Sequence, residues 1–297
     1  MNLTTLSRAA VLSAAAVLAA CGGGSDTNAP SVTNMGASSM MYGKSTTITV
    51  IGSGLNANLS ATIEPGCPTM TRGTPSDTQL TFTCKIAALG DLRARVRTEG
   101  GAELASLRLT VETPRVSMTV AQTVSGVTSS NSFVMELDPV AAPITVTNFL
   151  TYVNTGSCFY KDTLFHRVVR TGFSIAQAGG FKSGFVAVTG VGAPIALESN
   201  NGLKNLKYTV AMARTSEPNS ATSQFYINGT DNPAFDYVSA DQPGYAVFGK
   251  LISGTDVYDV LQAVPTTTKT AETNGQPVTF ADTPVDNVSI TACSQIR

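Results

Sequence analysis

The sequence predicts a mainly β protein with two domains. Short runs that alternate apolar and polar side chains, separated by Gly, Pro, Asn and Ser, recur along most of the chain. Only two segments have the spacing of an amphipathic helix. The composition, 42% hydrophobic and 13% charged, is typical of folded domains. A chain of 297 residues has room for two ordinary domains, and the sequence predicts their boundary at Thr113-Pro114.

Residues 1–20 have the pattern of a signal peptide. Arg8 provides a positive start, and the uncharged apolar run over residues 9–20 is too short for a bilayer, which needs about 20 residues. The run ends in Leu18-Ala19-Ala20-Cys21, which resembles a bacterial lipobox whose cysteine becomes the lipidated N-terminus; the alternative is ordinary cleavage beside a chance cysteine. Gly22 then favours the outer membrane. We expect an exported protein, anchored by lipid at Cys21 and facing the periplasm, with a flexible tether over residues 21–30.

The five cysteines support this interpretation, because an odd number is awkward for an exported protein. With Cys21 assigned to lipid, Cys67 and Cys84 remain in the first domain, and Cys158 and Cys293 in the second. One disulfide in each domain is the natural hypothesis for an oxidising compartment. Buried free thiols are the alternative, especially for the second pair.

The first domain is predicted over residues 31–112 as an antiparallel β-sandwich. Alternating or β-branched strand patterns occupy residues 46–50, 79–84, 92–97 and 105–111. The segments TTITVIGSGL and QLTFTCKI resemble immunoglobulin-like domains of the IPT/TIG type. The domain has no histidine and its acids are scattered at turns, so we expect a spacer or binding module. A separate hypothesis is that this domain is the functional part of the protein and binds cell-wall or surface polymers.

The second domain is predicted over residues 115–297 as a closed β-barrel with two helical lids. A helix opens at Pro143, places Val146, Phe149, Leu150 and Val153 on one face, and ends at Gly156. A second short helix carries Val257, Val260 and Leu261. Strands are expected over residues 116–124, 133–137, 208–213, 225–228 and 245–251 and around positions 165 and 175. Many strands with two helices favour a closed barrel.

Several function classes are excluded by what the sequence lacks. It has one histidine, no G-x-S-x-G, no Cys/His cluster with metal spacing and no phosphate-binding loop, so we expect no metal and no cofactor. The net charge of -1 argues against nucleic acid as a partner. His166, the single histidine, is more typical of a structural residue than of a catalytic one.

Six sequence blocks of the second domain closely resemble the cyclophilins of the bacterial periplasmic type. They are Phe165-His166-Arg167-Val168, then Gly172-Phe173 with Gln177, and residues 198–203, 211–215, 220–228 and 245–250. The resemblance covers residues 115–297. It implies an eight-stranded antiparallel barrel capped by two helices. It also implies a peptidyl-prolyl cis/trans isomerase that acts on proline-containing segments of exported proteins. We expect this protein to contact the membrane only through its N-terminal lipid.

The resemblance also implies residue roles. Arg167 is the expected donor to the prolyl nitrogen, and Gln224 is expected to bind the substrate backbone. Together with Phe173, these two residues are the expected catalytic residues. The expected substrate-binding residues are Gln177, Met212, Ala213, Arg214, Tyr226, Phe235 and Tyr245. Gln177 is also expected to orient Arg167. The alternative for the aromatic residues is a place in the barrel core.

The chain departs from the family pattern around Phe173. One residue is added between Arg167 and Phe173, and the following segment SIAQAGG is also longer than the usual pattern. An extra residue in a strand reverses the side-chain direction unless a bulge absorbs it. Tyr226 also replaces the usual phenylalanine, which adds a hydroxyl to an apolar floor. The insertions flanking Phe173 favour the alternative function, a non-catalytic proline-peptide-binding or chaperone module on the same scaffold.

Overall fold

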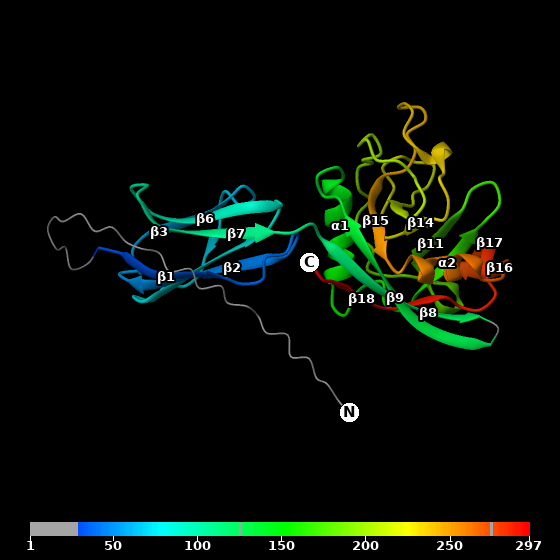
Figure 1. Cartoon of the computed structure of the whole chain (residues 1–297), viewed down its shortest axis with the longest axis horizontal. Coiled ribbons are helices and arrows are strands. Elements are labelled where there is room, and N and C mark those ends of the chain that lie inside the picture. Colours follow the sequence, from blue (N-terminus) through cyan, green and yellow to red (C-terminus); the bar gives the residue numbers. More distant parts are fainter. Residues whose placement is uncertain (1–28, 125, 274–275) are drawn as a thin grey trace. The chain divides into compact units, whose positions relative to one another are not determined.

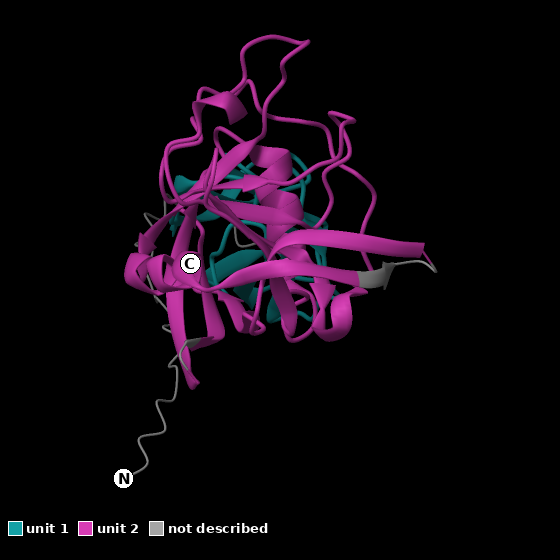
Figure 2. Cartoon of the chain, turned by 90° about the vertical axis from the view of Figure 1, so that its right-hand side faces the viewer, with its two compact units in different colours: residues 1–112 teal, residues 113–297 magenta. Residues whose placement is uncertain are grey.

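The structure is a computed structural model, and it describes residues 29–124, 126–273 and 276–297. The predicted signal peptide, Cys21 and most of the tether lie outside the described residues. The chain divides into two compact units, residues 1–112 and 113–297, which Figure 2 shows in different colours. Within the described ranges, every helix is too short or too polar to cross a bilayer.

The first unit contains two antiparallel sheets, which Figure 1 shows as two layers. One sheet has the strand order β1-β2-β5-β4 and the other the order β3-β6-β7. Alternate residues of both sheets are fully buried, for example Ile48 and Phe82 in one and Ile63 and Val96 in the other. The strands are β1 (Ser31–Ala37), β2 (Ser45–Ser53), β3 (Leu59–Glu64), β4 (Thr71–Arg72), β5 (Gln79–Lys85), β6 (Gly90–Thr98) and β7 (Glu103–Val111).

A disulfide joins the two sheets of this unit. Cys84 lies on β5, and Cys67 follows β3 and pairs through its backbone with Ile63. This bond is one of the two predicted disulfides. The immunoglobulin-like topology stays a prediction.

The second unit is a closed eight-stranded antiparallel barrel. Its strands run in the order β10-β18-β8-β9-β15-β13-β14-β11, and β11 pairs again with β10 to close the wall. The barrel strands are β8 (Arg115–Val124), β9 (Val127–Leu137), β10 (Thr163–Val169), β11 (Ile175–Lys182), β13 (Thr209–Met212), β14 (Phe225–Asn228), β15 (Val247–Ser253) and β18 (Ser289–Gln295). The predicted barrel is confirmed.

Further elements lie outside the barrel wall. The strand β12 (Val186–Ala187) adds to the edge of β11, and a separate hairpin pairs two further strands. These additional elements are the hairpin strands β16 (Thr266–Thr273) and β17 (Gln276–Pro284) and the 3-10 turns η1 (Ser183–Phe185) and η2 (Pro233–Phe235).

The helix α1 (Pro143–Asn154) begins at the predicted proline and buries the predicted face. Its first turn has no cap from Ala142. Instead the carboxylate of Glu198 accepts hydrogen bonds from the backbone N–H of Ile144 (3.0 Å) and of Thr145 (2.8 Å). A carboxylate at this end satisfies free N–H groups and complements the helix dipole. The Glu198 segment is thereby fixed to α1.

The helix α2 (Thr255–Ala263) is the second predicted helix and carries Val257, Val260 and Leu261. Tyr258 and Leu261 are buried, whereas Val260 is exposed. The Tyr258 ring carries a hydroxyl, but this group donates to the carbonyl of Ile227 at 2.7 Å, so the ring can be buried without an unpaired polar group.

A second disulfide joins Cys158, between α1 and β10, to Cys293 on β18. It therefore holds the C-terminal strand of the barrel to the loop that follows α1. Both predicted disulfides are present in the structure.

Candidate active site

One row of side chains crosses five strands on a single face of the barrel wall. Arg167 lies opposite Gln177, Gln177 opposite Tyr226, Tyr226 opposite Ala211, and Ala211 opposite Val247. Directly opposed residues of neighbouring strands point to the same face of a sheet. The sheet register therefore places side chains from β10, β11, β14, β13 and β15 side by side.

The opposite face of the wall forms the barrel interior. Phe165 of β10 and Phe225 of β14 are fully buried, and their ring centroids are 6.3 Å apart. Phe149 of α1 packs against Phe225 at 5.4 Å and against Phe248 of β15 at 5.0 Å. These rings are fully buried and pack against one another, which places this face of the wall in the barrel interior. The row that contains Arg167 consequently lies on the outer face.

The structure brings Arg167 and Phe173 together. The guanidinium carbon of Arg167 lies 5.6 Å from the centre of the Phe173 ring, within the range of a cation–π contact. The segment with the residue added between Arg167 and Phe173 runs into the connection between β10, which ends at Val169, and β11, which begins at Ile175, whereas the longer segment SIAQAGG forms most of β11. A register shift between Phe165 and Arg167 also marks a bulge. The extra length thus leaves both side chains on one side of the wall.

Arg167 has no hydrogen-bond acceptor and no acidic partner among the described residues. It is partly buried. Its N–H donors are therefore free to meet a bound molecule, while the ring of Phe173 restricts the position of the guanidinium group.

An apolar cluster lies next to Arg167 on the same face. Its buried members are Val169, Ile175, Ala211, Tyr226 and Val247, and its partly buried members are Phe173, Leu203, Ala213, Phe235 and Tyr245. The ring of Phe235 lies 5.0 Å from that of Phe173 and 5.2 Å from that of Tyr245. The ring of Tyr226 lies 5.8 Å from that of Tyr245. Four aromatic rings thus line one apolar surface, which we call the aromatic floor.

Met212 does not belong to the aromatic floor. It lies opposite Phe225 in the pairing of β13 with β14, so its side chain shares the face of the barrel core. Ala211, one residue earlier, faces the floor instead. The register therefore separates Met212 from the other predicted substrate-binding residues.

Gln177, a member of the row that contains Arg167, contacts a second glutamine, Gln224. The amide nitrogen of Gln177 donates to the side-chain oxygen of Gln224 at 2.9 Å. Gln224 also packs on Gly180, where a Cβ would lie 2.6 Å from the Gln224 amide carbon, so a larger residue there would displace the Gln224 side chain. No hydrogen bond joins Gln177 to Arg167 within the described part of the chain. Gln177 was expected to orient Arg167, and the two residues are related only as neighbours on the paired strands β10 and β11.

The Arg214 guanidinium is used to hold the rim of the site. It donates to the carbonyl of Gly244 twice, at 3.0 and 2.8 Å, and to that of Thr215 at 2.8 Å. It also lies 4.7 Å above the ring of Tyr245. Ala213, the neighbouring rim residue, donates its N–H to the carbonyl of Gln224 at 2.9 Å. Arg214 thereby fixes the two rim segments on either side of the aromatic floor.

The hydroxyl of Tyr226 has a partner that the sequence did not reveal. It donates to the side-chain oxygen of Asn205 at 2.8 Å, and Asn205 is itself fully buried. Burial raises the pKa of the Tyr226 hydroxyl well above its usual value, so this group stays a neutral donor. The polar atom added by tyrosine is therefore satisfied beneath an otherwise apolar floor.

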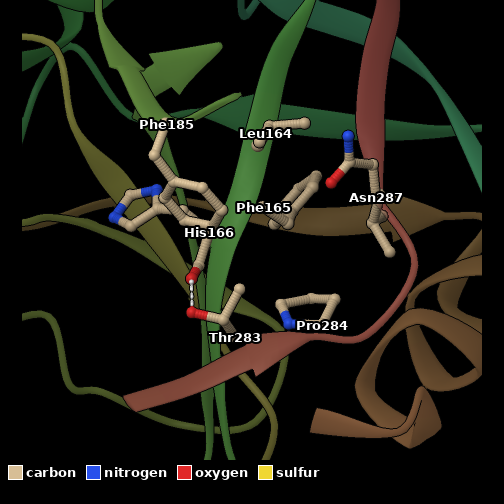
Figure 3. Close-up of a pocket in the computed structure, with 8 residues that line it drawn as sticks. Leu164, Phe165, His166, Phe185, Thr283, Pro284 and Asn287 are labelled. Carbon is tan, nitrogen blue, oxygen red and sulfur yellow. Dashed lines mark hydrogen bonds between the residues drawn. The ribbon is translucent and has the colours of Figure 1, made fainter. Parts of the chain in front are cut away.

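His166 faces away from this site. It packs against Phe181 at 4.9 Å, and Figure 3 shows it beside a small recess lined largely by apolar side chains, with its carbonyl accepting a hydrogen bond from Thr283 at 3.1 Å. Burial lowers the pKa of His166 to about 4. This placement is that of a structural histidine. No group of acids, cysteines or histidines in the described ranges is arranged to hold a metal ion.

Comparisons with known proteins agree on one family. The sequence profile described as "Cyclophilin type peptidyl-prolyl cis-trans isomerase/CLD" matches residues 123–295. Peptidyl-prolyl cis-trans isomerase A of Dickeya dadantii is 44% identical over 160 residues, which are 54% of this chain and 81% of that protein. Peptidyl-prolyl cis-trans isomerase cyp18 of Streptomyces antibioticus is 47% identical over 47% of this chain and 82% of that protein.

Two further similarities extend this set. Peptidyl-prolyl cis-trans isomerase B of Escherichia coli is 47% identical over 42% of this chain and 74% of that protein. The crystal structure of a Cryptosporidium parvum cyclophilin type peptidyl-prolyl cis-trans isomerase aligns with a TM-score of 0.46 at 23% identity, over 62% of this chain and 98% of that one. The sequence matches carry the family relationship.

Proposed function

The chain belongs to the cyclophilin-type peptidyl-prolyl cis-trans isomerases, and from this premise we propose that it isomerises X-Pro bonds of exported polypeptides while a lipid at Cys21 anchors it to a membrane. The enzyme class follows from the family. The substrate class, the site residues and the anchor are our proposals. The alternative of a non-catalytic module is not favoured, because the relatives at 43–47% identity are named as isomerases.

The isomerisation of an X-Pro bond requires no covalent intermediate and no cofactor. Amide resonance gives an X-Pro bond a rotation barrier of about 18–20 kcal/mol, while its cis and trans forms differ by only about 0.5–1 kcal/mol. An enzyme accelerates the rotation by binding the twisted amide more tightly than either planar form. In the twisted state the prolyl nitrogen regains its lone pair and becomes a hydrogen-bond acceptor.

Arg167 supplies the donor for that nitrogen in our proposal. A guanidinium stays protonated at any working pH and presents its N–H groups in a fixed plane. The observation that carries the proposal is the position of Arg167, which has no internal acceptor among the described residues and lies against Phe173 at the edge of the aromatic floor. The floor accepts the apolar proline ring, and Gln224 with Ala213 holds the adjoining peptide backbone.

Phe173 provides a direct test of the aromatic floor. We expect Phe173→Ala to lower kcat/KM on an Ala-Pro-Phe-type peptide by about tenfold or more, because the variant removes an apolar contact and a wall for Arg167. The matched control is Phe159→Ala, since Phe159 is also partly buried but packs on Tyr152. Circular dichroism establishes that both variants fold. Equal losses in the two variants would contradict the proposed site.

The lipid anchor is tested at Cys21. We expect the wild-type chain to sediment with the membrane fraction of a bacterial host and to incorporate radiolabelled palmitate, because several acyl chains give stable anchoring. The Cys21→Ser variant should lose the label and enter the soluble fraction. A Cys21→Ser variant that keeps both the label and the membrane location would refute the anchor.

We also propose that residues 31–112 form an immunoglobulin-like spacer or binding module. The two sheets with their joining disulfide support a self-contained β unit without a catalytic group of its own. The chain that lacks residues 31–112 should keep its kcat/KM on a short peptide. Loss of peptide activity with the barrel still folded would indicate that this unit takes part in catalysis.

A further inference from the structure

A continuous chain of buried side-chain amides runs beneath the aromatic floor. The Tyr226 hydroxyl donates to Asn205, and the amide nitrogen of Asn228 donates to the same Asn205 oxygen at 3.3 Å. The amide nitrogen of Asn232 then donates to the side-chain oxygen of Asn228 at 2.7 Å. The three asparagines are at most 4% exposed. Buried amides of this kind are tolerated because each finds partners, and such a network fixes the groups that it joins.

Asn232 also holds the backbone of the residue that follows Phe173. Its side-chain oxygen accepts from the N–H of Ser174 at 3.2 Å, and its amide nitrogen donates to the carbonyl of Ser174 at 2.9 Å. This paired contact mimics the pairing of two strands. Ser174 therefore has little freedom to move, although it ends a connection that is longer than the family pattern.

Gln262 of α2 joins both ends of the same connection. Its amide nitrogen donates to the carbonyl of Val169, two residues after Arg167, at 2.7 Å and to the hydroxyl of Ser174 at 2.8 Å. The carbonyl of Val169 can only accept, so it fixes the orientation of the amide, and the Gln262 side-chain oxygen lies 3.1 Å from the Tyr258 hydroxyl, whose single proton is shared with the carbonyl of Ile227. One side chain thus links the strand that carries Arg167 to the segment that carries Phe173.

Gly229 leaves the space in which these contacts form. A Cβ at this position would overlap the Ser174 hydroxyl and lie 3.1 Å from the amide carbon of Gln262. The Gly229 N–H also donates to the Ser174 carbonyl at 2.8 Å. The chain at Gly229 is therefore packed directly against both Ser174 and Gln262.

We infer that Asn232 and Gln262 are positioning residues of the isomerase, which fix both ends of the connection over residues 170–174 and so hold Phe173 against Arg167. A longer connection samples more conformations, and a displacement of about 1 Å at a reacting group can cost about 100-fold in rate. The two amides offset the added length by restraining Val169 and Ser174. This inference rests on the proposed roles of Arg167 and Phe173.

The test is a double-mutant cycle on kcat/KM with the full chain and an Ala-Pro-Phe-type peptide. Asn232→Ala should lower kcat/KM by about tenfold in the wild-type background. In the Phe173→Ala background it should lower kcat/KM by less than about twofold, because the ring that it positions is already gone. Asn154→Ala is the matched control: its amide bonds to the Gln295 side chain at 2.8 Å, away from the floor, and it should leave kcat/KM unchanged.

Two milder variants keep the test decisive where Asn232→Ala does not fold. Ser174→Ala removes the hydroxyl that Gln262 binds, and Gln262→Glu keeps the size of the side chain but removes its amide donor. Each should lower kcat/KM and show the same dependence on Phe173. Equal losses in both backgrounds would overturn the positioning role. Full activity of Phe173→Ala alone would instead refute the proposed role of Phe173, and the inference with it.

Discussion

His166 gives the barrel a stability that depends on pH. The side chain is 4% exposed, its Nδ1 atom has no hydrogen-bond partner, and it packs against Phe181 and Phe280. Burial in these surroundings lowers its pKa from 6.5 to about 4, with a smaller lowering from the charge of Arg167, against a backbone hydrogen bond at Leu164 that raises it. The folded protein therefore holds His166 in its neutral form.

The sign of the effect follows from proton binding. Between pH 6.5 and pH 4 the unfolded chain binds a proton at His166 and the folded chain does not, so acid favours unfolding. The stabilisation is fully present above pH 6.5 and decreases as the pH falls. Each tenfold change in proton affinity corresponds to about 1.4 kcal/mol, so the loss reaches about 3 kcal/mol below pH 4 and about 2.5 kcal/mol at pH 4.5.

The assay compares wild type with His166→Phe in urea denaturation at pH 7 and pH 4.5. All tyrosines except Tyr42 lie in the second unit and the chain has no tryptophan, so near-ultraviolet circular dichroism reports on the barrel. Carboxylates titrate in both proteins, and their effect cancels in the difference. We expect wild type to lose about 2.5 kcal/mol more than the variant between the two pH values. An equal loss in both proteins would refute the assignment of a buried neutral histidine.

Three further predictions concern the second unit. Replacement of Cys158 and Cys293 by alanine opens a loop of 135 residues, so the free energy of unfolding should fall by up to about 5 kcal/mol in urea denaturation; a loss under about 1 kcal/mol would contradict a structural bond. Tyr226→Phe should cost about 1 kcal/mol of stability but keep kcat/KM within about threefold, because the hydroxyl binds beneath the floor and not at the substrate; a tenfold loss of activity would exclude this. Glu198→Ala should lower the free energy of unfolding by about 1–2 kcal/mol through loss of the contacts at the first turn of α1, and no change in thermal or urea midpoint would count against that contact.

Local pattern was sufficient for much of the barrel. The helical spacing from Val146 to Val153 predicted α1, because its apolar face is nearly continuous. The motif around Arg167 predicted the strand β10 that carries it. By contrast, β16 is rich in threonine and largely exposed, so it lacks the buried alternation by which strands are recognised from sequence.

The missing parts of the candidate site depend on register and on long-range contacts. Met212 and Ala211 are adjacent in sequence, and only the pairing with β14 decides which of them faces the floor. Asn205 lies 21 positions from Tyr226, and no local pattern links an asparagine in a loop to the hydroxyl that it accepts. Asn232 and Gln262 were missed for the same reason, since their partners at Ser174 come from another part of the chain.

The most direct test of the account is the isomerase activity of Arg167 variants. We predict that Arg167→Ala lowers kcat/KM on the Ala-Pro-Phe-type peptide by about 100-fold or more, with unchanged circular dichroism, because the donor to the twisted amide nitrogen is lost. Arg167→Lys should recover little of this activity, since an ammonium lacks the planar set of donors. An Arg167→Ala variant that isomerises the peptide as fast as wild type would contradict the central claim.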